Sequence, residues 1–426
     1  GNVTQGSFGP FARPDGEWGV SFDGDSDYLQ FAASSDFAFG TGDFTFECFF
    51  FMKDAGTYDY LMTFGNNTNA DSIGLYIQAG LVKVYNGGVI VDAGSTTVTL
   101  NTWHHVAVVR ISSTLKMYLD GNQVHSVSNS SNIASTGGAN IARWGLISDG
   151  QYFNGVISNA RVVKGTGVYT GNFTPSTSKL TAITNTKLLT CQSNRFLDNS
   201  ATGHTVTPYA TSAVSAFGPF LTSAVYDAAV NGASAYFDGT ADALSIASSP
   251  ISASGNFTLE GWVYSNSASE QAIVGQYQGR STGRMLVYTS NGKLIFFQNG
   301  VTGGNSGSNV TLGQWAHFVL QRTGSNIAFY ENGARVLNNS AGNIAQDYLV
   351  IGTEDVNSGN YPNTFDGYIS NIRVTSSAVY SEGTSITVPT APYSTVTNTN
   401  LLLNMADAQA IDSAAQNNLT LYGNAN

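Results

Sequence analysis

The chain contains two copies of one sequence module, and this repetition constrains its fold more than any other feature. Short motifs recur in the same order in both halves: FGPF at 8–11 and 217–220, SFDGDSDYL at 21–29 and YFDGTADAL at 236–244, NTWHHVAVVR at 101–110 and GQWAHFVLQR at 313–322, FNGVISNARV at 153–162 and FDGYISNIRV at 365–374. The members of each pair are about 210 positions apart, which is the signature of a repeated domain. We therefore expect one module in residues 1–216 and a second in residues 217–426, each of a usual size for a single β domain.

The repeat also indicates where a module ends. LLT at 188–190 has a counterpart in LLL at 401–403. We expect this strand to close its own module, because otherwise residues 399–426 would have no sheet to join. Gly1-Asn2 and Gly423-Asn424 lie at the same phase of the repeat, which predicts further copies beyond this sequence.

Composition and local pattern favour strands. Charged residues make up 11% of the chain, while 24 Phe and 21 Tyr provide material for a core. Apolar and polar residues alternate in FTFECFFF and LKMYLDG, as in half-buried strands. DG at 120–121 and NG at 332–333 lie between apolar runs and predict hairpin turns. We expect an all-β chain of two tandem antiparallel β-sandwiches.

Several classes of function are disfavoured. A net charge of −11 offers no basic surface for nucleic acid, and the apolar runs are too short to span a membrane. The two cysteines, Cys48 and Cys191, are expected to be buried thiols, with a single bridge between them as the alternative. No phosphate loop, nucleophile elbow or HExxH motif is present.

The ordered motifs carry a family likeness. FDG…DYL, FTFE, WHHVAVVR, KMYLDGNQV and FNGVISNARV, together with their second copies, resemble the laminin-G-like (concanavalin A-like) jelly-roll module. A narrower likeness covers residues 161–200, which are similar to repeats in structural proteins of marine tailed phages, particularly cyanophages. Residues 373–404 depart from that narrower pattern. The resemblance implies a fold that hosts lectins, adhesion modules and glycosidases, so it leaves function open.

The adjacent histidines His104 and His105 suggest a reactive or metal-binding pair. In a strand they point to opposite faces and cannot chelate one metal together. The second copy keeps His317 but has Ala316 in place of His104. We therefore expect structural histidines.

Carboxylates decide whether a glycosidase is plausible, because that chemistry needs two of them close together. Glu47 and Glu260 have no acidic neighbours at alternate positions. We expect a protein without enzymatic activity.

A calcium site is the most credible cofactor. Asp23, Asp25 and Asp27 alternate in DGDSDY and offer hard oxygen ligands. The second copy has Thr240 in place of Asp25, which favours the alternative that these aspartates cap backbone amides in a turn.

Loops that differ between the copies are the expected place for glycan recognition, which uses exposed aromatic rings beside polar groups. Trp103 and Trp315 occupy one position amid apolar residues and are expected in the core. The candidate sugar-binding residues are Tyr58, Tyr60, Trp144, Tyr152, Tyr277 and Tyr361.

These observations favour a non-enzymatic structural or adhesive protein of a virion surface, in a phage appendage, fibre or decoration. Its expected partners are other virion proteins, further copies of itself in a homo-oligomer, and host-surface glycans. The alternative is the carbohydrate-binding region of a secreted bacterial adhesin or polysaccharide-degrading enzyme. A glycosidase is the third and least favoured function.

Overall fold

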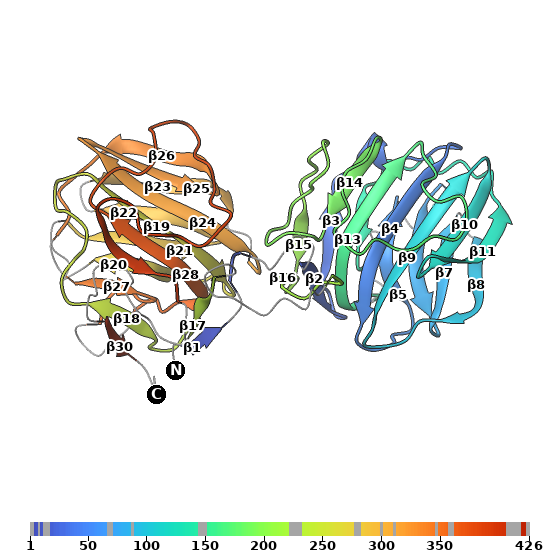
Figure 1. Ribbon diagram of the computed structural model, residues 1–426, viewed down its shortest axis with the longest axis horizontal. Coiled ribbons are helices and arrows are strands. Elements are labelled where there is room, and N and C mark those ends of the chain that lie inside the picture. The colour runs from blue at the N-terminus through green and yellow to red at the C-terminus, as the bar shows by residue number, and fades with distance from the viewer. Residues whose placement is uncertain are drawn as a thin grey trace. The chain divides into compact units, whose positions relative to one another are not determined.

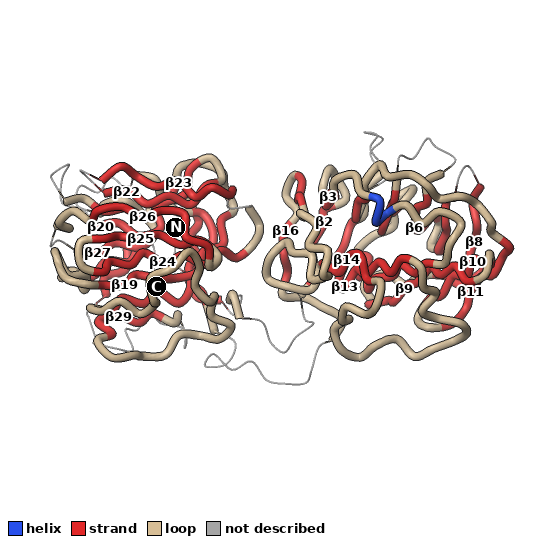
Figure 2. Tube along the Cα trace, turned by 90° about the horizontal axis from the view of Figure 1, so that it is seen from above, coloured by secondary structure: helices blue, strands red, loops and turns tan. Residues whose placement is uncertain are grey.

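The computed structural model describes residues 4–6, 9–11, 18–65, 71–86, 89–143, 151–220, 232–276, 283–298, 301–309, 312–345, 348–356, 362–405 and 419–422. Across these residues the secondary structure is β-strand apart from one short 3-10 helix, η1 (Ser35–Phe37) (Figure 2). No described helix is long and apolar enough to cross a membrane. The expected all-β architecture is confirmed.

The chain divides into two compact units. The first module comprises Pro14–Ser223, and the second module comprises Ala224–Asn426 together with Gly1–Arg13. The boundary suggested by the repeat, between residues 216 and 217, therefore differs from the structural one. The FGPF motif at 217–220 and its preceding strand, Ala213–Ser215, join the first module, where this strand pairs with Gly19–Asp23.

The first module consists of two antiparallel sheets (Figure 1). Its eight-stranded sheet has the order β11 (Asn122–Ser128), β10 (Thr114–Leu119), β9 (Trp103–Ile111), β4 (Phe44–Met52), β13 (Asn154–Lys164), β2 (Gly19–Asp23) and β16 (Ala213–Ser215), with β14 (Thr186–Thr190) also paired to β13. Its seven-stranded sheet has the order β15 (Thr207–Tyr209), β3 (Tyr28–Phe31), β12 (Ala139–Ile141), β5 (Asp59–Phe64), β6 (Ile73–Gln78), β7 (Leu81–Asn86) and β8 (Val89–Thr97).

The second module repeats this arrangement. Its eight-stranded sheet has the order β1 (Thr4–Gly6), β17 (Ser234–Asp238), β28 (Asp366–Thr375), β19 (Phe257–Ser265), β24 (Trp315–Thr323), β25 (Asn326–Glu331) and β26 (Ala334–Ser340), with β29 (Thr399–Leu403) also paired to β28. Its seven-stranded sheet has the order β23 (Val301–Asn309), β22 (Lys293–Gln298), β21 (Met285–Ser290), β20 (Gln271–Gln276), β27 (Leu349–Ile351), β18 (Ala243–Ile246) and β30 (Leu419–Tyr422). The pairing of β14 with β13 and of β29 with β28 confirms that the LLT and LLL strands close their own modules.

Strand β4 shows how the core forms. Its alternate residues Phe44, Phe46 and Phe50 are fully buried, and Phe46 packs against Phe64 of the facing sheet with 4.9 Å between ring centroids. Each such ring contributes about 1.5–3 kcal/mol through burial. The opposite face of β4 is buried as well, because a long segment after β13 crosses it. Phe49 on that face packs against Leu180 of this segment.

A bulge in β13 fixes which side chains reach this covered face. Ser158 pairs with Phe49 and Arg161 pairs with Glu47, so one extra residue is inserted between them. Asn159 occupies the bulge with φ 52°, and its side-chain oxygen accepts a hydrogen bond from the Leu180 amide at 2.8 Å. The extra residue places the Arg161 guanidinium on the same face as Glu47.

Candidate functional site

A buried charged cluster lies beneath the segment that covers the first module. The Glu47 carboxylate accepts hydrogen bonds from the Arg161 guanidinium at 2.6 and 2.9 Å and from the Tyr169 hydroxyl at 2.7 Å. The His105 ring nitrogen Nε2 lies 3.0 Å from its second oxygen. Glu47 is fully buried and Arg161 and His105 nearly so. The cluster therefore joins β4, β9, β13 and the covering segment, and its carboxylate is shielded from solvent.

The second module has a related cluster with one different connection. Glu260 accepts hydrogen bonds from Arg373 at 2.8 Å and from the Tyr380 hydroxyl at 2.6 Å. His317, the counterpart of His105, instead lies 2.7 Å from the hydroxyl of Tyr393. Leu180 stands at the corresponding place in the first module, since Leu180 and Tyr393 have the same amide contact to a bulge asparagine.

The two glutamates differ in their acidity. Burial opposes the charge of Glu47, but the His105 hydrogen bond and the Arg161 charge outweigh it, so the pKa of Glu47 lies below its usual value. Burial prevails at Glu260 despite Arg373 and Tyr380, so the pKa of Glu260 lies above its usual value. The extra histidine contact accounts for the difference.

His104 and His105 point to opposite faces of β9, as predicted. Whereas His105 meets Glu47, His104 Nδ1 lies 2.7 Å from Asp120, and its Nε2 lies 2.9 Å from the Thr99 hydroxyl. Burial by itself would lower the pKa of His104. The hydrogen bond and the charge of Asp120 outweigh burial, so the pKa of His104 lies above its usual value. The pKa of Asp120 is correspondingly lowered, because the partner histidine outweighs burial.

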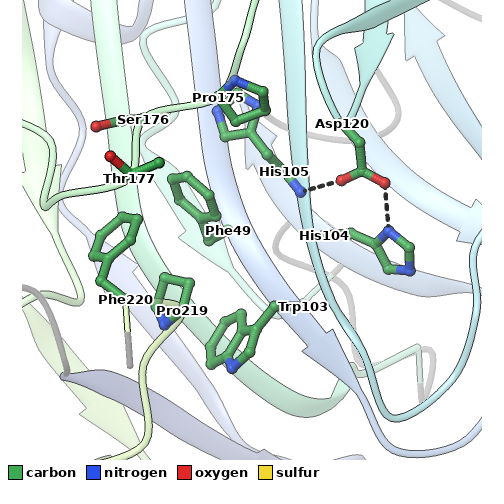
Figure 3. Close-up of a pocket in the computed structure, with 10 residues that line it drawn as sticks. All are labelled: Phe49, Trp103, His104, His105, Asp120, Pro175, Ser176, Thr177, Pro219 and Phe220. Atoms are coloured by element: carbon green, nitrogen blue, oxygen red, sulfur yellow. Dashed lines mark hydrogen bonds and ion pairs between the residues drawn. The ribbon is translucent and has the colours of Figure 1, made fainter. Parts of the chain in front are cut away.

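A pocket of about 400 Å³ opens beside this histidine–aspartate pair (Figure 3). Aromatic rings of the lining come from Phe49, Trp103 and Phe220. Polar side chains lie on two sides: Ser176 and Thr177 beside Phe220, and His104 and Asp120 on the far side of Phe49 from them (Figure 3). The full lining is Phe49, Trp103, His104, His105, Asp120, Pro175, Ser176, Thr177, Pro219 and Phe220.

Two buried nitrogen atoms of lining residues have no hydrogen-bond partner among the described protein atoms: Nε1 of Trp103 and Nδ1 of His105. Trp103 is only partly buried, whereas its counterpart Trp315 is fully buried. The expectation that both tryptophans belong to the core is therefore correct for Trp315 and wrong for Trp103, which faces the pocket.

Three of the aromatic residues expected to bind sugar are described, and they lie away from this pocket. Tyr60 is buried and stacks on Tyr76 of the neighbouring strand, and Tyr58 lies beside the same ring. Tyr152 is partly exposed and lies 6.3 Å from Tyr28, which stacks on Tyr209. None of the three lines the pocket. Trp144, Tyr277 and Tyr361 lie outside the described residues.

Of the three aspartates expected to hold calcium, Asp23, Asp25 and Asp27, the first and the last cap backbone amides of the turn. The Asp27 carboxylate accepts hydrogen bonds from the amides of Asp23 and Thr211 at 3.0 and 2.7 Å, and Asp23 accepts one from the Asp25 amide at 2.8 Å. Burial raises the pKa of Asp27. Among the described residues no three acidic, histidine or cysteine groups are placed to hold a metal. Asp23 and Asp27 therefore take the turn-capping role that the sequence offered as the alternative to calcium binding.

Cys48 and Cys191 are buried free thiols, as expected. Burial raises the pKa of both.

Sequence reasoning missed the pocket, although the repeat carried a signal for it. Asp120 accepts the His105 amide hydrogen with one oxygen, as Asn332 does for His317. Its second oxygen contacts His104. Where His104 is replaced by Ala316, Asp120 is also replaced, by Asn332, so both halves of the ion pair differ together.

The family follows from a match over both modules. The model of the concanavalin A-like lectin/glucanases superfamily, a laminin G domain family, matches residues 23–166 and 238–382, which together exceed half of the chain. The chain belongs to this superfamily. Membership explains the two-sheet sandwich in each concanavalin A-like module, and it leaves the role of each module open.

Solved structures with this architecture share little sequence with the chain. Domains LG4-5 of the mouse laminin alpha1 chain are 14% identical, with 90% of this chain and 98% of that one covered and a TM-score of 0.31. The CBM40 domain of a Ruminococcus gnavus sialidase bound to alpha2,3 sialyllactose is 16% identical, with coverage of 40% and 95% and a TM-score of 0.30. Domain 4 of an extracellular arabinanase from Geobacillus stearothermophilus, in complex with arabinotriose, is 15% identical, with coverage of 35% and 73% and a TM-score of 0.30. A search of curated protein sequences gave no match.

Proposed function

We propose that this chain is a non-catalytic, surface-exposed binding protein that takes carbohydrate in the pocket of its first module. The observation that carries the proposal is the combination of aromatic rings and polar side chains around a pocket of about 400 Å³. This volume lies within the range of small-molecule sites, which combine apolar surface with a few polar groups.

The two kinds of lining residue suit the apolar C–H face and the hydroxyl groups of a sugar. Trp103 and Phe220, both partly exposed, offer rings on which the C–H face of a pyranose stacks. The hydroxyls of Ser176 and Thr177 and the Asp120 carboxylate, whose side chain is 47% exposed, offer hydrogen bonds to sugar hydroxyls. Because no lysine or arginine is among the lining residues, neutral glycans are favoured over anionic ones.

The absence of catalysis is inferred from the same groups. Hydrolysis of a glycosidic bond by the common mechanism needs two carboxyl groups about 5–9.5 Å apart. Asp120 is the one carboxylate among the lining residues. Glu47 is fully buried and engaged by Arg161, so it does not supply the second.

The setting that we propose is a virion surface, in a phage appendage or decoration whose copies form a homo-oligomer and contact host glycans. The likeness of residues 161–200 to phage structural repeats supports this setting. These residues also supply Arg161, Tyr169 and part of the pocket rim. A carbohydrate-binding region of a secreted adhesin or polysaccharide-degrading enzyme is the alternative. Antibody labelling of virions under the electron microscope separates the two.

A blocking variant tests the carbohydrate site. Thr177→Trp places a large ring at an exposed position on the pocket rim, and Thr390→Trp makes the same change at the corresponding exposed position of the second module. On an array of neutral and acidic oligosaccharides, we expect the unaltered chain and Thr390→Trp to bind the same neutral glycans. Thr177→Trp should lose that binding by at least about tenfold.

Equal binding by all three proteins would refute the pocket as the site. Release of reducing sugar from any bound glycan would refute the non-catalytic role.

A further inference from the structure

The second module carries two tyrosines and two aspartates side by side on one face of its eight-stranded sheet. Strand β17 lies beside β28 (Figure 1), with Tyr236 paired to Tyr368 and Asp238 paired to Asp366. In each strand the tyrosine and the aspartate are two positions apart, so all four side chains project from the same face. Phe237, between Tyr236 and Asp238, is fully buried on the opposite, core face. We call the four residues the Tyr–Asp patch.

The rings of the Tyr–Asp patch lie close together at the surface. The centroids of Tyr236 and Tyr368 are 4.9 Å apart, and the ring planes are tilted by 45°. Both tyrosines and Asp366 are partly exposed, and Asp238 is exposed. The face of a tyrosine ring is electron-rich, so it attracts a positive group placed over it. The two rings therefore offer adjoining surfaces to a cation.

The two carboxylates make the patch negative. Asp366 accepts a hydrogen bond from the Asn266 side chain at 3.0 Å, and Asp238 accepts one from the Thr240 amide at 2.7 Å. These donors are neutral, so they orient the carboxylates without neutralising them. Like charges directly opposite on neighbouring strands repel each other. Burial raises the pKa of Tyr236, and the charge of Asp366 raises it further, so this carboxylate is close enough to act on the ring.

The first module lacks this combination in otherwise matching strands. Ser21 and Asp23 of β2 pair with Val156 and Asn154 of β13 in the same register. Both rings and one of the two carboxylates are therefore specific to the second module. Since the same strand pairing forms without them, backbone pairing does not account for their presence.

We propose that the Tyr–Asp patch binds an arginine side chain of a partner protein. A guanidinium group stacks flat on aromatic rings and forms paired hydrogen bonds with carboxylates. Its positive charge also relieves the repulsion between Asp238 and Asp366. The net charge of −11 on the whole chain attracts a basic partner from a distance. No residue of the patch lines the carbohydrate pocket, so the two sites are independent.

Titration with N-acetyl-arginine amide tests the proposal on the full chain. The tyrosine rings are labelled with carbon-13, and the variants Tyr236→Phe and Tyr368→Phe assign the two resonances by their loss. We expect the arginine probe to shift these two resonances saturably at low salt. N-acetyl-citrulline amide has nearly the same shape without the charge and should bind at least about fivefold more weakly. N-acetyl-lysine amide should also bind more weakly than the arginine probe, because an ammonium group does not stack flat on a ring.

Variants that install residues of the first module test which groups hold the probe. Asp366→Asn should weaken arginine binding by about threefold. The double variant Tyr236→Ser/Tyr368→Val should weaken it by about tenfold, measured by saturation transfer to the probe. The matched control Asp23→Asn makes the same charge change on the corresponding strands of the first module and should leave binding unaltered. Thermal unfolding checks that each variant keeps its fold.

Several results would overturn the proposal. These are the absence of a saturable shift with the arginine probe, equal binding of the citrulline probe, and undiminished binding to the double variant. Binding of the lysine probe as tight as that of the arginine probe would remove the assignment to a guanidinium group. A calcium ion that shifts the two tyrosine resonances at lower concentration than the arginine probe would show an inorganic cation site instead. None of these results bears on carbohydrate binding by the first module.

Discussion

The two modules use the same buried position differently, and one side chain explains why. In the second module the Tyr393 hydroxyl meets His317, so Glu260 has no histidine contact and interacts with Arg373, Tyr380 and Tyr393 instead. In the first module Leu180 offers no hydroxyl, and His105 contacts Glu47 instead. A change outside the central strands thus alters the acidity of a carboxylate within them. The comparison shows that repeated strands do not guarantee repeated electrostatics.

The largest expected difference in stability between the modules follows removal of the buried arginine from each cluster. Arg161→Met leaves Glu47 charged and buried, which should destabilise the first module by about 3–5 kcal/mol. Arg373→Met should cost the second module less, because Glu260, with its raised pKa, binds a proton more readily. Hydrogen exchange of peptides from β4 and β19 measures the two modules separately.

The double variant Arg161→Met/Glu47→Gln serves as the control and should recover part of the loss. Equal losses from the two arginine variants would show that the glutamates do not differ as described.

Neutralising each glutamate sharpens the comparison further. Because the folded-state pKa of Glu47 is lowered, its stabilisation is present above its ordinary pKa of 4.5 and is lost as the pH falls through the folded value. The folded-state pKa of Glu260 is raised instead. The contribution of Glu260 to the free energy of unfolding is therefore present below pH 4.5 and is lost as the pH rises through the folded-state pKa. At pH 7 Glu47→Gln should therefore cost about 1–3 kcal/mol, whereas Glu260→Gln should cost much less.

Denaturant unfolding at pH 7 and pH 4, monitored by exchange in each module, measures these effects. The penalty for Glu47→Gln should shrink at the lower pH, and a penalty independent of pH would contradict the assigned acidity.

Tyr393→Phe breaks the feature that separates the modules. It removes the 2.7 Å contact between the tyrosine hydroxyl and His317, and loss of a buried hydrogen bond should cost the second module about 1–2 kcal/mol. The Nε2 chemical shift of His317 should change, whereas that of His105 should not. An unchanged His317 resonance would show that the hydroxyl is not its partner.

The smallest expected effect concerns the His104–Asp120 pair beside the pocket. Because the folded-state pKa of His104 is raised, its contribution to the free energy of unfolding is complete below pH 6.5. This contribution is lost as the pH rises through the folded-state pKa. The lowered pKa of Asp120 makes its contribution present above pH 3.8 and lost as the pH falls through the folded value. The pair should therefore stabilise most between these limits.

A double-mutant cycle with His104→Ala and Asp120→Asn should give a coupling of about 0.5–1 kcal/mol at pH 5.5, small because Asp120 is half exposed. The coupling should fall at pH 8.5. A coupling that grows with pH would contradict a charged pair.

Part of the candidate site was readable from the sequence. Alternation along a strand predicted that His104 and His105 point apart. The replacement of His104 by Ala316 predicted a structural histidine and gave no indication of the pocket. The rest depended on contacts between distant segments. Trp103 faces a pocket because Ser176, Thr177 and Phe220 are brought to it by two later loops. The partnership of Glu47 with Arg161 needs a bulge at Asn159, which shifts the register by one residue.

The sequence by itself determined the architecture of two β-sandwiches, and it predicted the buried thiols. It also offered turn capping as one of two roles for the aspartates in DGDSDY. Local pattern suffices for this, because side-chain alternation, turn residues and repeat spacing are properties of neighbouring positions. Only the tertiary structure decided that the FGPF motif at 217–220 joins the first module. It also decided that the strand Thr4–Gly6 joins the second module. The edge of a sheet can pair with many different strands, because the pairing uses backbone hydrogen bonds. Which strand reaches the edge depends on the path of the whole chain.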